Sequence, residues 1–110
     1  MNGTDEGLRG RVMGLGDLVA YQAGAVVSRT LIDEPAGTVT LFAFDEGQGL
    51  SEHTAPFDAM VTMVDGEAEV TVGDEVHTVE RGQMIITPAD VPHALRARQR
   101  FKMLLVLVRQ

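Results

Sequence analysis

The side chains of this 110-residue sequence best suited to chemistry are two histidines, His53 and His93, which lie in separate blocks of the chain. An imidazole titrates near neutrality, so it can serve as a metal ligand, as a general base or as a hydrogen-bonding group for a bound molecule. The sequence contains no cysteine, which excludes disulfides, thiolate metal sites and a cysteine nucleophile. Any metal ion would therefore depend on nitrogen and oxygen ligands.

Three carboxylates are close to these histidines in the sequence: Glu52, Asp58 and Asp90. Glu52 is adjacent to His53, so strand alternation predicts that it points to the opposite face. Asp58 lies in a short turn between two expected strands. We therefore take Asp58 as the better candidate to complete a metal site of two histidines and one carboxylate, if a bulge turns it inward.

These side chains must be positioned by β structure, because apolar residues recur at spacing two or in short runs along most of the sequence. Turns rich in glycine and aspartate separate the runs. The pattern predicts an all-β fold of about ten short antiparallel strands in a sandwich or barrel. Residues 1–16 are expected to form a loose tail and residues 17–110 one domain. The expected strands are 17–22, 26–32, 38–44, 50–55, 59–64, 67–72, 75–80, 84–87, 93–97 and 101–108.

Two stretches resemble the two motifs of the cupin superfamily. The first motif runs Gly, five residues, His-x-His, three or four residues, Glu, six residues, Gly, and the second runs Gly, five residues, Pro-x-Gly, two residues, His. The matching positions are Gly47, His53, Gly66, Gly82, Pro88 and His93. The resemblance covers residues 17–110 in strand number and order. It implies a small single-domain, RmlC-like cupin with an antiparallel double-stranded β-helix, the jelly-roll barrel.

The sequence departs from the cupin pattern at the metal-binding positions. In typical cupins the motif side chains hold Fe, Mn, Ni, Zn or Cu inside the barrel. Here the second histidine is replaced by Ala55 and the glutamate by Ala59, and Ala97 stands where some cupins have asparagine. Alanine has no donor atom, so the resemblance leaves His53 and His93 as family ligands and implies weak or absent metal binding.

These observations favour a binding module that holds a small polar metabolite, such as an organic acid or a sugar derivative. We expect His53, His93, Phe57 and Met63 to line its pocket. One alternative is a cupin enzyme, a metal-dependent oxygenase or an isomerase or lyase, in which the two histidines are ligands or a general base. Another is a dimeric scaffold or regulatory subunit whose histidines have no chemical role.

The charge distribution argues against nucleic acid as a partner. Residues 1–80 hold 3 basic and 15 acidic side chains, residues 81–110 hold 6 and 1, and the formal net charge is −7. The basic residues Arg96, Arg98, Arg100 and Lys102 recur at spacing two, as on the solvent-facing side of a strand. For Arg29 we expect an ion pair with an acid at the rim, the alternative being that it faces the cavity.

The apolar pattern bears on partners and location. The longest apolar run, residues 103–108, is far shorter than the roughly 20 residues that cross a bilayer, so no membrane association is expected and a cytoplasmic location is the default.

Residues 39–44, 59–64 and 101–108 are apolar on both strand faces. One face must therefore be covered from outside the barrel core, which predicts a homodimer formed face to face through one sheet. The alternative is that the N-terminal tail covers this face within one chain.

Overall fold

The computed structural model describes residues 5–109, which form nine strands and two short 3₁₀-helices. This confirms the predicted all-β class. The helices are η1 (Glu6–Leu8) and η2 (Leu15–Leu18), and the strands are β1 (Val26–Glu34), β2 (Gly37–Phe44), β3 (Gly49–His53), β4 (Ala59–Asp65), β5 (Glu67–Val72), β6 (Glu75–Glu80), β7 (Met84–Thr87), β8 (His93–Arg96) and β9 (Phe101–Val108). No helix within the described part of the chain is long and apolar enough to cross a membrane.

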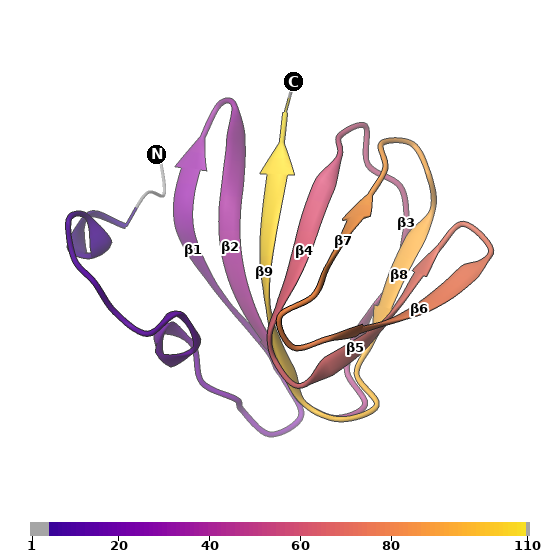
Figure 1. Ribbon diagram of the computed structural model, residues 1–110, viewed down its shortest axis with the longest axis horizontal. Coiled ribbons are helices and arrows are strands. Elements are labelled where there is room, and N and C mark those ends of the chain that lie inside the picture. The colour runs from indigo at the N-terminus through magenta and orange to yellow at the C-terminus, as the bar shows by residue number, and fades with distance from the viewer. Residues whose placement is uncertain (1–4, 110) are drawn as a thin grey trace.

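Two antiparallel sheets face each other across the core (Figure 1). The five-stranded sheet has the order β1-β2-β9-β4-β7, and the four-stranded sheet has the order β3-β8-β5-β6. After β2 the chain crosses repeatedly from one sheet to the other, so strands distant in sequence become neighbours. This is the double-stranded β-helix that the cupin resemblance implied.

Alternate residues of the facing strands fill the core, as the period of two requires. The rings of Phe44 and Phe101 stack at its closed end with their centroids 4.6 Å apart. Met63 and Met103 are directly opposite each other in the β4–β9 ladder and are fully buried. Burial of each such side chain stabilises the fold by about 1.5–3 kcal/mol.

The strand predicted at residues 17–22 is wrong. Leu15–Leu18 form η2, and Val19 and Tyr21 follow in irregular backbone. Leu18, Val19 and Tyr21 pack with Leu41 of β2 on the outer face of the five-stranded sheet. This apolar segment is therefore buried against a sheet surface and does not pair in a ladder.

This packing bears on the predicted homodimer. Leu41 and Ala43 are on the outer face of the five-stranded sheet but are completely buried, because residues 15–21 cover them within the same chain. On the same face, Met84, Ile86 and Val108 remain exposed. The chain thus covers part of the apolar face by itself, and the homodimer stays a prediction for the uncovered part.

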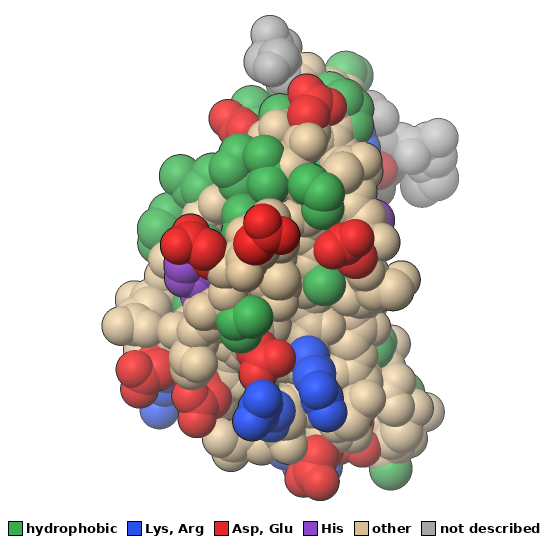
Figure 2. All heavy atoms as spheres, turned by 90° about the vertical axis from the view of Figure 1, so that its right-hand side faces the viewer, with side chains coloured by type: hydrophobic (Ala, Val, Ile, Leu, Met, Phe, Trp, Pro, Cys, Tyr) green, Lys and Arg blue, Asp and Glu red, His purple; other side chains and the backbone are tan. Residues whose placement is uncertain are grey.

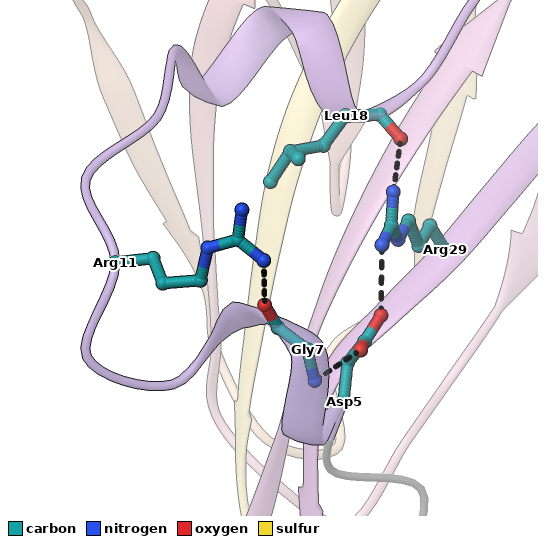
Figure 3. Close-up of polar contacts among 5 residues, drawn as sticks. All are labelled: Asp5, Gly7, Arg11, Leu18 and Arg29. Carbon is teal, nitrogen blue, oxygen red and sulfur yellow. Dashed lines mark hydrogen bonds and ion pairs between the residues drawn. The ribbon is translucent and has the colours of Figure 1, made fainter.

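Contacts of Arg29 hold the N-terminal segment against β1 (Figure 3). One guanidinium nitrogen is 2.8 Å from the Asp5 carboxylate, and the other donates to the Leu18 carbonyl oxygen at 3.3 Å. The hydrogen bond from Arg29 lowers the pKa of the Asp5 carboxyl group. Arg29 therefore makes the expected ion pair on the outside, and the alternative that it faces the cavity is wrong. The division into a loose tail and one domain stays a prediction, with Asp5 tied to β1 by these contacts.

Tyr21 anchors the C-terminal end of residues 15–21, the segment that covers the outer face of the five-stranded sheet. Its hydroxyl donates to the Asp65 carboxylate at 2.6 Å, and its ring lies 4.7 Å from the Arg100 guanidinium carbon and 5.0 Å from Lys102 Nζ. Lys102 also donates to the Gly16 carbonyl oxygen at 2.6 Å. Burial and the bond to Asp65 raise the pKa of Tyr21 well above its usual value.

We expect Tyr21→Phe to lower the free energy of unfolding by about 1 kcal/mol near pH 7, because the Asp65 carboxylate loses its donor. A folded-state pKa above the unfolded value contributes stability that is present below about pH 10 and lost as the pH rises further. The difference between wild type and variant should therefore shrink above about pH 10. Urea denaturation of both proteins near pH 7 and above about pH 10 checks this. A difference in unfolding free energy between wild type and variant that is the same at both pH values would contradict it.

Candidate functional site

The two histidines meet where β3 ends and β8 begins. His53 and His93 are direct partners in the β3–β8 ladder, and their ring centroids are 4.3 Å apart in an edge-to-face arrangement. His53 is exposed, whereas His93 is only 8% exposed. The predicted convergence of these two imidazoles is confirmed.

A break in strand register directs His53 inward. The β3–β8 pairing shifts between Leu50 and His53, so these two residues line the same cavity although they are three positions apart. Regular alternation would have placed them on opposite faces. Glu52 lies within this irregular stretch and is exposed.

The histidines lie at a cavity of about 200 Å³ between the two sheets. Its wall is almost entirely aliphatic or aromatic, and among residues 5–109 Thr87 is the only polar lining side chain apart from the histidines. Thr87 is buried and its hydroxyl is 3.5 Å from the Ala59 carbonyl oxygen. The lining residues are Leu50, His53, Ala55, Phe57, Ala59, Val61, Thr87, His93, Leu95, Met103, Leu105 and Leu107.

Of the predicted pocket residues, the structure places His53, His93 and Phe57 at this cavity and leaves out Met63. Met63 does point inward from β4, but it is in the closed part of the core, next to Phe44 and Phe101. Its ladder partner Met103 lines the cavity instead. The contribution of β9 to the cavity was not expected from the sequence, although the inward alternation of Met103, Leu105 and Leu107 could have indicated it.

Asp58 does not join the histidines. Its Oδ1 accepts a hydrogen bond from the main-chain nitrogen of Ala89 at 2.8 Å, which ties the turn before β4 to the loop after β7. Within residues 5–109, no three His, Asp or Glu side chains come close enough together to hold a metal ion. The geometry therefore gives no support to Asp58 as the third ligand.

Both imidazoles are oriented by main-chain carbonyl groups two residues earlier. His53 Nδ1 is 2.7 Å from the Ser51 oxygen, and His93 Nδ1 is 3.1 Å from the Val91 oxygen. A carbonyl oxygen can only accept, so Nδ1 must carry the proton. In the neutral ring Nε2 then has a free lone pair, and each histidine offers the cavity one hydrogen-bond acceptor or metal ligand.

The loop that leads into His93 contains a backbone feature that favours glycine. Asp90 has φ = 64°, and it occupies the motif position at which cupins have glycine. Its main-chain nitrogen donates to the Ala55 oxygen at 2.8 Å and so joins the two loops at the cavity.

We expect Asp90→Gly to raise the free energy of unfolding by about 0.5–1 kcal/mol. The left-handed conformation costs a non-glycine residue roughly 1 kcal/mol or more, and the greater freedom of glycine in the unfolded chain offsets part of this. The main-chain bond to Ala55 is kept. Thermal or urea denaturation checks the result, and a clear loss of stability would show that the Asp90 side chain has a role of its own.

Two facing antiparallel sheets with an internal cavity at the β3–β8 junction define the class of protein as a jelly-roll barrel. The cupin-domain family profile matches residues 40–108, and the chain belongs to this family. None of the curated proteins compared matches the chain.

Solved structures agree with this assignment. A conserved protein of unknown function from Streptococcus pyogenes is 40% identical, with a TM-score of 0.88, and the match covers 92% of this chain and 89% of that one. A cupin 2 conserved barrel domain protein from Leptotrichia buccalis is 39% identical with a TM-score of 0.85; the match covers 88% of this chain but 47% of that chain, about half its length. A cupin superfamily protein from Desulfitobacterium hafniense is 27% identical over 91% and 92% of the chains, with a TM-score of 0.86.

The donor set fits the metal of typical cupins poorly. Ala55 and Ala59, which replace a histidine and a glutamate, both line the cavity beside His53 and His93. The family positions are therefore in the expected place, but half of them have no donor atom. Two neutral imidazoles without a carboxylate are a weak site for a divalent ion.

Proposed function

We propose that this protein is a binding module that holds a small molecule in the barrel cavity, with His53 and His93 as the polar contacts and no requirement for a metal ion. The observation that carries the proposal is an apolar cavity lined by two histidines, His53 and His93, each of which bonds the main chain through Nδ1 and so keeps Nε2 for a ligand. Concave apolar pockets with a few fixed polar groups are the usual form of small-molecule sites.

The location of binding can be tested by filling the cavity. Ala59 is buried and lines the cavity, so Ala59→Leu places a larger apolar side chain inside it. We expect this variant to stay as stable as wild type, within about 1 kcal/mol, because added apolar burial offsets any strain. Ala20→Leu, at an exposed position, is the matched control.

The measurement is an NMR titration of the chelator-treated protein with small ring compounds. Wild type and Ala20→Leu should show shift changes at the cavity residues, and Ala59→Leu should lose them. Equal binding by Ala59→Leu, or shift changes confined to another part of the molecule, would contradict the proposal.

A second candidate is a metal-dependent cupin, favoured by the fact that Nε2 of both rings is the nitrogen left free for coordination. Metal analysis of protein purified without a histidine tag distinguishes the two, together with His53→Ala and His93→Ala. Stoichiometric metal that both variants lose would favour the metalloprotein. Little or no metal in any of the three proteins would favour the metal-free pocket.

A further inference from the structure

We propose that the ligand of this cavity is a neutral, largely apolar molecule, about the size of one six-membered ring, that carries one or two hydroxyl or N–H donors. This rests on the proposed function and narrows it. It also replaces the organic acid or sugar derivative that the sequence suggested, because the wall of the cavity suits neither.

The polar atoms that the cavity offers are acceptors. In the neutral form, His53 and His93 each use the ring N–H on a carbonyl group, so each presents only the Nε2 lone pair. The Thr87 hydroxyl points to the Ala59 oxygen and keeps its own lone pairs. A ligand hydroxyl or N–H therefore finds partners here, and a ligand group that only accepts does not.

An organic acid meets neither a cation nor a donor at this site. Within the described part of the chain, no Lys or Arg lines the cavity. Arg29 is bound to Asp5 on the outside of β1, and Arg98 and Arg100 pair with Glu69 and Asp45. Figure 2 shows acidic side chains spread over the face it views, with Lys and Arg gathered in the lower part. A buried carboxylate without a partner is strongly unfavourable.

A sugar derivative carries more hydroxyls than the cavity can bind. Each buried hydroxyl that lacks a partner is penalised, and the wall beyond the three polar residues is made of alanine, valine, leucine, methionine and phenylalanine. The same wall favours an apolar ring through burial of its surface.

The volume sets the size of the ligand. An apolar protein cavity of about 150 Å³ holds a benzene molecule. The cavity here has about 200 Å³, which leaves room for one ring with one or two small substituents. Phe57 lies at this cavity and offers an aromatic surface for such a ring.

Four probes separate the possibilities in the metal-free wild-type protein. They are p-cresol (one donor), p-xylene (the same shape without a donor), p-toluate (the same ring with an anion) and xylose (many hydroxyls). We expect p-cresol and p-xylene to bind with shift changes at the cavity residues, and p-toluate and xylose to bind at least about tenfold more weakly than p-cresol.

Variants then test the role of the acceptors. His53→Phe and His93→Phe keep a flat ring without nitrogen, and each should weaken p-cresol binding by about three- to tenfold while p-xylene binding changes less. His77→Phe, at a half-buried position outside the cavity, should bind both probes as wild type does.

The outcomes distinguish failure of the proposed ligand class from failure of the proposed small-molecule binding. Binding of p-toluate or xylose as tight as that of p-cresol would overturn the ligand class and leave small-molecule binding intact. The same holds if the histidine variants weaken p-cresol and p-xylene equally. If none of the four probes binds in the cavity of the wild type, both the ligand class and the proposed function fail.

Discussion

Ala55→His combined with Ala59→Glu is expected to create a tight metal site where wild type has a weak one. Both alanines line the cavity beside His53 and His93, so the double variant brings three imidazoles and one carboxylate into one cavity. We expect the affinity for Zn²⁺, Co²⁺ or Ni²⁺ to rise by about 100-fold or more. Each added donor strengthens chelation and replaces a water molecule that would otherwise be a ligand of the metal ion.

Calorimetric titration of the chelator-treated proteins measures this gain. The matched control is Ala20→His with Ala36→Glu, which adds the same side chains at exposed positions. Its affinity should stay close to that of wild type. Similar affinities for the two double variants would show that the side chains at positions 53, 55, 59 and 93 do not converge on one metal ion.

Gly66→Ala is expected to be strongly destabilising, lowering the free energy of unfolding by about 3 kcal/mol or more, because a positive φ and a main-chain clash act together at this position. Gly66 has φ = 70°, and a Cβ atom at this position would be 2.5 Å from the Arg100 carbonyl oxygen and 3.2 Å from Phe101. The obstacle is main chain next to a fully buried ring, so it has little freedom to move. A domain of this size has only about 5–15 kcal/mol of stability to lose.

Gly82→Ala separates the cost of the positive φ from the cost of the clash with the main chain. Gly82 has φ = 84°, but no atom lies within 4 Å of a Cβ added there. Only the conformational cost applies, and we expect a loss of about 1 kcal/mol. Urea denaturation of the two variants measures the difference, and equal losses would mean that the close approach of Arg100 to Gly66 is relieved at no cost.

Strand positions were predictable where alternation and tight turns agree. The strands 67–72, 75–80, 84–87 and 101–108 begin and end where the sequence predicted, because turns such as Gly73-Asp74 and Arg81-Gly82 fix their ends. The meeting of His53 and His93 was also predictable, since the cupin resemblance places both at motif positions inside the barrel, although the strand expected at 50–55 ends at His53.

The remaining features depend on contacts that no local pattern encodes. Leu18, Val19 and Tyr21 form a short apolar segment as a strand would, and only the apolar outer face of β2 explains why they pack against a sheet instead of pairing in one. Asp58 has the right chemistry for a ligand, but the Ala89 N–H, far along the chain, binds it. The register break before His53 has no clear signal in the sequence, although it decides which face His53 occupies.

The proposed function depends on two histidines, His53 and His93, that donate through Nδ1 and keep Nε2 for a ligand without a bound metal ion. A long-range ¹H–¹⁵N spectrum of the histidine rings, recorded before and after chelator treatment, reads this state directly. We predict that His53 and His93 both show the Nδ1-protonated neutral ring, and that the chelator changes neither signal. A proton on Nε2 of either ring, or signals that shift when metal is removed, would contradict the proposed metal-free binding site.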